Sequence, residues 1–151
     1  MSPQSGLVVR SLREEDRAEW QHLWTGYLAY CETTVSAEIH DSTFTRLLGE
    51  NARDFNAFVM VSDGQLVGLT HFIYHRHAWI IKDVCYLQHQ YTAPKFRGTG
   101  IGQAMIVAVN TAADKRGAPS VYWLSQDFNA AGRHQCDRVG QLPPFIKHQR
   151  P

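Results

Sequence analysis

The sequence lacks any apolar run long enough to cross a membrane, and cysteine is scarce. A membrane-spanning helix needs about 18 to 20 consecutive apolar residues, and no stretch of the 151 residues approaches that length. The N-terminus also lacks the basic and apolar segments of an export signal. The three cysteines, Cys31, Cys85 and Cys136, lie far apart, without the spacing of a disulfide framework or a zinc site. We therefore expect a soluble, cytoplasmic protein without a bound metal.

Neither sign of charge dominates the sequence. Fifteen Lys and Arg residues face 14 Asp and Glu residues, which leaves a net charge of +1. This balance gives no overall attraction to nucleic acid or to an anionic membrane, and we expect neither as a partner. The basic residues in the middle and C-terminal parts of the sequence could still converge on a small polyanionic ligand. They are Lys95, Arg97, Lys115, Arg116, Arg133 and Arg138.

The length and the 44% hydrophobic content predict a single domain over residues 1–151. Apolar periodicity and turn residues predict an α/β fold with about six to seven strands. We expect strands at 7–12, 58–61, 66–73, 79–92, 121–124 and 145–147, the long one bent or divided in two. Helices are expected from 13 to 28, after a cap at 41–43 as far as 48, over 101–115, and from 129 to 139. Asp63-Gly64 predicts a hairpin turn between the second and third strands.

A glycine-rich loop lies between an expected strand and an expected helix. It reads Arg97-Gly98-Thr99-Gly100-Ile101-Gly102, and an apolar helical repeat begins directly behind it. Alternate glycines let the backbone turn tightly, and the free N–H groups at a helix N-terminus attract phosphate. The loop therefore predicts a phosphate cradle.

Spacing separates the families of phosphate loops. A nucleoside triphosphate P-loop needs a lysine after its last glycine, where this sequence has Gln103. A dinucleotide loop needs its third glycine three positions after the second, early in a β-α-β unit. Here the glycines alternate and an antiparallel hairpin precedes them, so both readings are disfavoured.

The remaining pattern, Arg-x-x-Gly-x-Gly, closely resembles the pyrophosphate loop of the GCN5-related N-acetyltransferases (GNAT). Two further segments are similar to that superfamily: residues 87–94 resemble its fourth strand, and Asn129-Ala130-Ala131 before Asp137-Arg138 resembles its coenzyme A helix. The resemblance extends from Leu7 to Lys147. Within the superfamily, three segments resemble the small branch of histone, polyamine and D-amino-acid acetyltransferases: Cys85-Tyr86-Leu87-Gln88, Val121-Tyr122-Trp123-Leu124 and Phe145-Ile146-Lys147. The resemblance to this superfamily implies a mixed, mostly antiparallel sheet flanked by helices, acetyl-coenzyme A as co-substrate, and a homodimer.

The resemblance also implies which residues bind the coenzyme. Backbone N–H groups between Gly98 and Gln103 would take the pyrophosphate, with Arg97 adding charge, while Gln90, Tyr91 and Thr92 would pair with the pantetheine arm. The implied set is Gln90, Tyr91, Thr92, Arg97, Gly98, Thr99, Gly100, Ile101, Gly102, Gln103, Asn129 and Arg133.

Three residues are expected at the reaction centre. The backbone N–H around Tyr91 would polarise the acetyl carbonyl. His89 stands where close relatives carry an aspartate, and is either a base or a structural strand residue; Asp83, Glu32 and Tyr86 are alternative bases. Cys136 aligns with the tyrosine that serves relatives as general acid, and a thiol is shorter and more acidic than a phenol.

The acceptor pocket is expected from the first helix and from the end of the hairpin. Its candidates are Tyr27, Tyr30, Glu32, His75 and Trp79. Glu32 would suit a cationic amine. His75 and His77 lack a third ligand in the sequence, so the segment is interpreted as a turn rather than as a metal site.

These residues favour an N-acetyltransferase that transfers an acetyl group from acetyl-coenzyme A to a primary amine by direct attack in a ternary complex. The acceptor would be a small amine, an amino acid, a polyamine or a protein lysine. Because His89 and Cys136 depart from the pattern, an acyl-coenzyme A binding or sensor domain with impaired catalysis is the alternative. A generic nucleotide-binding module is the second.

Overall fold

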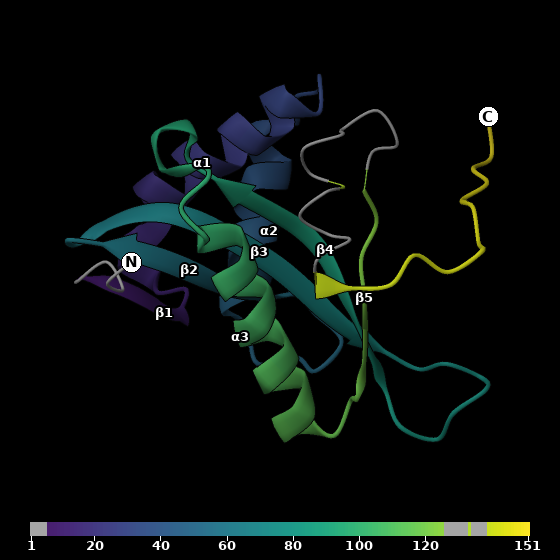
Figure 1. The fold of residues 1–151 in the computed structure, drawn as a ribbon. Coiled ribbons are helices and arrows are strands. Elements are labelled where there is room, and N and C mark those ends of the chain that lie inside the picture. The colour runs from purple at the N-terminus through teal and green to yellow at the C-terminus, as the bar shows by residue number, and fades with distance from the viewer. Residues whose placement is uncertain (1–5, 126–132, 134–138) are drawn as a thin grey trace.

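The computed structural model describes residues 6–125, 133 and 139–151, and its secondary structure follows the expected order as far as Tyr122 (Figure 1). Most of the helix expected over 129–139 lies outside the described residues. The elements are β1 (Leu7–Ser11), the 3₁₀ turn η1 (Glu14–Asp16), α1 (Arg17–Tyr30), α2 (Ala37–Leu48), β2 (Asn56–Ser62), β3 (Gln65–His75), β4 (Val84–Thr92), the 3₁₀ turn η2 (Pro94–Phe96), α3 (Ile101–Arg116) and β5 (Ser120–Tyr122). Within this described part of the chain, no helix is long and apolar enough to cross a membrane.

The strands form one sheet in the order β1-β2-β3-β4-β5. The first four strands pair antiparallel, and β5 runs parallel to β4. This confirms the mixed, mostly antiparallel sheet, although the described residues contain five strands instead of the expected six to seven. The hairpin turn is also confirmed: Asp63 and Gly64 both have positive φ angles, 49° and 79°, as the tight turn favoured between two strands requires.

One expected strand is absent from the described residues, and two expected elements begin at other residues than predicted. Residues 145–147 form no strand, since Phe145 and Ile146 are exposed without a neighbouring strand in the described residues. The long strand begins at Val84, because residues 76–83 form a protruding loop in which Ile81 is 99% exposed. The second helix begins at Ala37, because Ser36 rather than Asp41 is its cap: the Ser36 hydroxyl accepts the Ile39 N–H.

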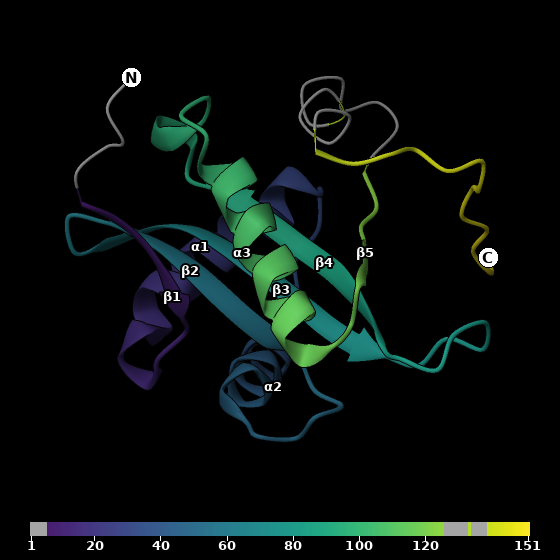
Figure 2. The ribbon, with the colours of Figure 1, turned by 60° about the horizontal axis from the view of Figure 1, so that its bottom comes forward.

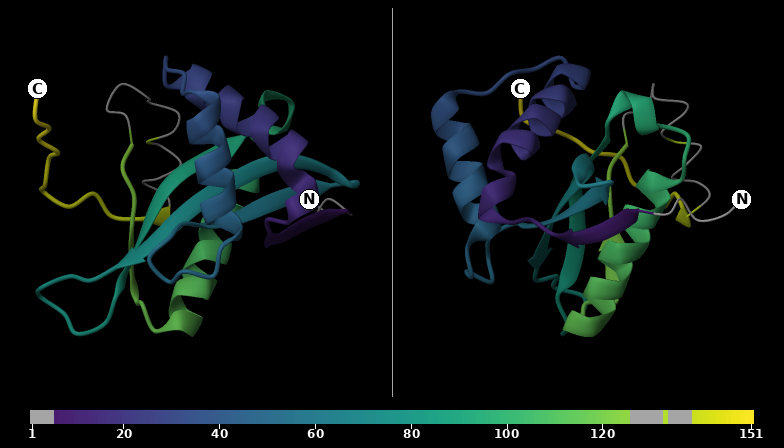
Figure 3. Two further views of the ribbon diagram at one scale, coloured as in Figure 1. Left: turned by 180° about the vertical axis from the view of Figure 1, so that it is seen from behind. Right: turned by 90° about the vertical axis from the view of Figure 1, so that its left-hand side faces the viewer.

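The helices cover both faces of the sheet (Figures 2 and 3). Helices α1 and α2 lie on one face and enclose a cluster built on Trp20, Trp24, Phe44 and Leu69. Helix α3 lies on the other face. Its buried side chains, including Ile106 and Val109, pack against Phe72 and Leu87. Strand β4 therefore lies between two separate apolar layers: Cys85 and Leu87 belong to the layer under α3, and Tyr91 belongs to the layer under α1.

Candidate active site

The outer edge of β4 is open over its second half. Strand β5 pairs with β4 only from Val84 to Tyr86. Beyond that point the two segments run apart (Figures 1 and 2), and residues 87–92 have no strand partner on this side in the described part of the chain. An extended ligand can therefore add its own hydrogen bonds to this edge, as a strand would.

The pairing register decides which β4 backbone groups face the open edge. In an antiparallel ladder, alternate residues direct their N–H and C=O groups toward the partner strand. The Ala93 N–H donates to the Val67 carbonyl of β3 at 2.8 Å. Counting back in twos, the Tyr91 N–H also faces β3, whereas the backbone groups of Gln90 and Thr92 face the edge. The Tyr91 N–H therefore does not face the open edge, whereas the N–H groups of its two neighbours do.

A β-bulge in β4 decides which side chains face which helix. His71 of β3 pairs with His89, but the next residue, Phe72, pairs with Leu87, so Gln88 is an extra residue in β4. A bulge shifts the alternation of side chains by one position. Leu87 consequently packs in the layer under α3, while Tyr91, four residues later, packs in the layer under α1. His89 joins Tyr91 on the α1 side.

His89 lies in an aromatic cluster between β4 and α1. Its ring centroid is 4.9 Å from that of Trp24, 5.2 Å from Tyr27 and 5.5 Å from His71. Burial lowers the pKa of His89 to about 4. Burial, together with the neighbouring charge of His89, lowers the pKa of His71 to about 3. Both imidazoles are therefore neutral at pH 7, and His89 accepts a proton only weakly.

Tyr91 packs directly on the backbone of α1 at Gly26, a residue that the sequence did not single out. A β-carbon placed on Gly26 would lie 2.7 Å from the Tyr91 hydroxyl oxygen and 3.1 Å from its ring. Only glycine leaves room for this contact, although glycine within a helix costs about 1 kcal/mol relative to alanine. An isolated glycine inside a helical pattern was the available signal.

Arg97 is tied to its surroundings rather than free. Its guanidinium carbon lies 5.3 Å from the ring centre of Tyr91 and 5.7 Å from that of Tyr30, and its Nε donates to the Thr92 carbonyl at 3.2 Å. Stacking on two rings favours the planar, delocalised cation of arginine over lysine. Arg97 therefore connects the end of α1 to the start of the glycine loop.

The glycine loop presents an uncapped helix N-terminus. Gly98 and Gly100 have φ angles of 76° and 84°, a left-handed conformation that favours glycine. Gly100 precedes α3 without a side-chain cap, and the first bond inside the helix runs from the Ala104 N–H to the Gly100 carbonyl. The N–H groups of residues 101–103 thus have no acceptor inside the helix. A β-carbon placed at Gly98 or Gly100 meets no atom within 4 Å, so the loop surface is open to a ligand.

Gln90 fastens this helix start to β4. Its side-chain Nε2 donates to the Gly102 carbonyl at 3.1 Å, and its Oε1 is buried without a partner in the described residues. The edge residue and the helix N-terminus are therefore held next to one another. This placement brings together the sequence-predicted residues 90–92 and 97–103 at one end of the sheet.

The expected acceptor residues fall into two separate groups. Tyr27 lies against His89 and Tyr30 against Arg97, and Glu32 follows two residues after α1 ends. His75 pairs instead with Val84, at the opposite end of β4 from Tyr91. Seven residues of strand separate those two positions, which is about 23 Å. There His75 contacts the Tyr122 hydroxyl at 2.7 Å, and Trp79 is 82% exposed in the protruding loop.

The remaining candidates lie elsewhere. Asp83 is 3.8 Å from Arg116, and Tyr86 stacks on Tyr122, both toward the loop end of β4. Asn129 and Cys136 lie outside the described residues, whereas Arg133 is described and half-buried. No three potential metal ligands cluster among the residues that the structure describes.

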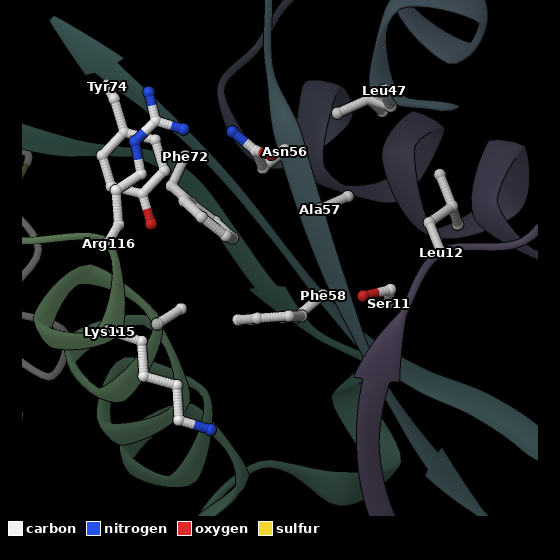
Figure 4. A pocket seen from close by; sticks show the side chains of 11 residues that line it. Ser11, Leu12, Leu47, Asn56, Ala57, Phe58, Phe72, Tyr74, Lys115 and Arg116 are labelled. Carbon is white, nitrogen blue, oxygen red and sulfur yellow. The ribbon is translucent and has the colours of Figure 1, made fainter. Parts of the chain in front are cut away.

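A hollow of about 440 Å³ lies away from this site, where β1 ends and exposes the start of β2 (Figure 4). Phe58, Phe72 and Tyr74 line it, with Lys115 and Arg116 at its rim. Arg116 lies over the Tyr74 ring, 4.1 Å from its centre. Lys115 and Arg116 belong to the end of α3 opposite the glycine loop, so the hollow is not part of the expected phosphate cradle.

Comparison with known proteins identifies the family. The model of the acetyltransferase (GNAT) family matches residues 9–140. The chain is 27% identical over 145 residues to the D-amino-acid N-acetyltransferase HPA3 of Saccharomyces cerevisiae, covering 95% of this chain and 90% of that protein. The fold resembles a ribosomal-protein-alanine N-acetyltransferase from Brucella melitensis biovar Abortus 2308, with a TM-score of 0.78, 19% identity, and coverage of 97% and 99% of the two chains. It also resembles the aminoglycoside N-acetyltransferase AAC(6')-Iy in complex with CoA, with a TM-score of 0.79, 15% identity, and coverage of 99% and 98%. The chain therefore belongs to the GNAT family of acetyltransferases.

Proposed function

We propose that this protein transfers the acetyl group of acetyl-coenzyme A to the primary amine of a small molecule, by direct attack in a ternary complex. One observation carries the proposal: the open edge of β4 leads directly to the uncapped N-terminus of α3. An elongated ligand with a phosphate at one end and amide groups along its arm fits this pair of features. Coenzyme A has that composition, and AAC(6')-Iy is a family member whose structure contains it.

The chain supplies two kinds of contact to the coenzyme. The N–H groups of residues 101–103, aided by the helix dipole, would hold the pyrophosphate. The outward backbone groups of Gln90 and Thr92 would pair with the amides of the pantetheine arm. One of these two N–H groups would also donate to the thioester carbonyl and stabilise the negative charge that develops there. Removing a single donor of this type costs about 3 kcal/mol in other enzymes.

The acceptor amine has to be uncharged when it attacks. With a pKa of about 4, His89 is poorly matched to removing a proton from an ammonium group. We therefore assign most of the rate to positioning and to carbonyl polarisation, and the proton leaves to solvent. Cys136 is proposed to protonate the leaving thiolate, in the place where relatives have a tyrosine.

The acceptor is proposed to bind beside α1. Tyr27 and Tyr30 supply aromatic surface there, and Glu32 supplies a carboxylate at the end of the helix. This composition suits a small cationic amine. Among the related proteins, HPA3 is a D-amino-acid N-acetyltransferase and AAC(6')-Iy an aminoglycoside N-acetyltransferase. Amino acids of both configurations and aminoglycosides are thus the first acceptors to test.

Calorimetry with acetyl-coenzyme A and a free-thiol assay over a panel of amines test the proposal together. We expect coenzyme binding in preference to ATP or a dinucleotide, and thiol release with at least one amine. Tight binding without thiol release on any amine would instead support an acyl-coenzyme A sensor, which the weakly basic His89 favours. Preference for ATP would contradict the assignment of the phosphate cradle.

A further inference from the structure

A chain of contacts leads from α1 through two buried side chains, Trp20 and His71, to the half-buried His89. Trp20 of α1 donates from Nε1 to Nε2 of His71 at 3.1 Å, and Nδ1 of His71 lies 3.4 Å from Nδ1 of His89. Trp20 is 0% exposed and His71 1% exposed. Acetyl transfer as proposed above does not use Trp20 or His71. We propose that Trp20 and His71 set the tautomer of His89, so that His89 offers a hydrogen-bond donor, and not a lone pair, at Nε2.

The first step depends on the chemistry of the indole. A tryptophan Nε1–H can only donate a hydrogen bond. Its partner, Nε2 of His71, must therefore accept and carry no proton. Both side chains are buried, so neither group can form its hydrogen bond with bulk water instead.

The second step follows from the single N–H of a neutral imidazole. Because Nε2 of His71 accepts, the proton of His71 has to lie on Nδ1. That N–H faces Nδ1 of His89, and only one proton fits between two facing nitrogens. His71 consequently donates and His89 accepts, which leaves the proton of neutral His89 on Nε2.

The surroundings of the pair favour the neutral forms. Trp24 and Tyr27 of α1 pack on the two imidazoles, and burial raises the pKa of Tyr27, which keeps its hydroxyl uncharged. From α2, His40 contacts the ring of Trp20 instead. No carboxylate contacts either imidazole in the hydrogen bonds and ring contacts of the described residues. A second proton on His71 would, moreover, place an N–H against the indole N–H.

The functional consequence rests on the proposed acetyl transfer. A base at Nε2 needs a lone pair, and the tautomer set by Trp20 removes it. His89 can instead donate to an oxygen of the bound acceptor, such as a carboxylate or hydroxyl. Trp20 and His71 are positioning residues for this donor.

Nitrogen-15 NMR of the histidine side chains tests the tautomers without any substrate, because protonated and unprotonated ring nitrogens have well-separated shifts. The signals are assigned with His71→Asn and His89→Asn. We expect protons on Nδ1 of His71 and on Nε2 of His89. A proton on Nε2 of His71, or a charged His71 at pH 7, would overturn the proposal in the wild-type spectrum alone.

Trp20→Phe removes the donor that sets the direction of the chain. We expect both directions to become populated, so that the shifts of His71 and His89 move toward averaged values. Trp24→Phe is the matched control, because Trp24 packs on the same rings but its Nε1 has no partner within the described structure. It should retain the wild-type tautomers. An unchanged tautomer in a folded Trp20→Phe protein would contradict the role of Trp20.

Kinetics test the donor separately. His89→Gln keeps an N–H donor and should retain kcat/KM within about threefold, whereas His89→Leu should lose about tenfold or more, about 1.4 kcal/mol. Equal losses in both variants would refute the donor role. If no amine is acetylated at all, the proposed function fails, while the NMR result still decides the tautomers.

Discussion

The two buried histidines should make the stability of this protein strongly dependent on pH. Their folded pKa values of about 3 and about 4 lie below the ordinary value of 6.5. Between pH 6.5 and about 4, the unfolded chain therefore binds protons that the folded protein excludes. The stability that the neutral pair provides is fully present above pH 6.5, and is lost as the pH falls through this range.

The loss of stability at pH 5 depends little on the pKa values of the two histidines in the folded protein, because both values lie below 5. An unfolded histidine with a pKa of 6.5 is almost fully protonated there. Each pH unit below that pKa corresponds to about 1.4 kcal/mol, so keeping one histidine neutral costs about 2 kcal/mol. Lowering the pH from 8 to 5 should thus reduce the free energy of unfolding by about 4 kcal/mol, a large share of the 5–15 kcal/mol typical of a domain.

Urea denaturation at several pH values, followed by tryptophan fluorescence, measures this difference. His71→Gln removes one titrating group, so the difference between pH 8 and pH 5 should fall to about 2 kcal/mol, whatever the variant's own stability at pH 8. His22→Gln is the control, because His22 is exposed on α1, and it should leave the difference unchanged. A wild-type difference below about 1 kcal/mol, or an unchanged one in His71→Gln, would refute the buried neutral pair.

Three other substitutions test the site. Gly100→Val should weaken coenzyme binding at least about tenfold in calorimetry; Gly64→Val places the same residue at a similar φ, 79° against 84°, in a distant hairpin, and should leave the affinity unchanged. Gly26→Ala should lower the free energy of unfolding in urea by about 1–2 kcal/mol, because the overlap with Tyr91 exceeds the gain in helix propensity; equal or greater stability would contradict that contact. Cys136→Tyr should raise turnover in the thiol-release assay, and a lower rate with intact coenzyme affinity would count against the alignment of Cys136.

Local sequence signals predicted the features that depend on neighbouring residues. The hairpin at Asp63-Gly64 and the loop at residues 97–102 each need a backbone conformation that a few adjacent residues specify. The helix behind the loop begins at Ile101, as its apolar repeat predicts. For the same reason, the conformation of the loop that is proposed to bind phosphate could be predicted from sequence. The absence of a strand at 145–147 could not, since a strand requires a neighbouring strand.

Long-range pairing determined the parts that sequence could not predict. His71 is separated from His89 by 18 residues and from Trp20 by 51. The pairing of β3 with β4 brings the two histidines together, and the packing of α1 on the sheet adds Trp20. His75 and Trp79 looked suitable for an acceptor pocket by residue type. The length of β4 instead places Val84, the partner of His75, about 23 Å from Tyr91, and Trp79 lies in the protruding loop at that same end.

The bulge at Gln88 decides which β4 side chains face each side of the site. If Gln88 were a regular strand residue, strict alternation would place Leu87, His89 and Tyr91 on one face of the sheet. The bulge leaves Leu87 in the layer under α3 and brings His89 and Tyr91 against α1. It also places the Gln90 side chain at the start of α3, where it binds the Gly102 carbonyl, while the Gln90 backbone faces the open edge. The bulge thus directs His89 and Tyr91 to the α1 side, proposed for the acceptor, and keeps Leu87 on the α3 side, while the open edge of β4 lies between the two sides.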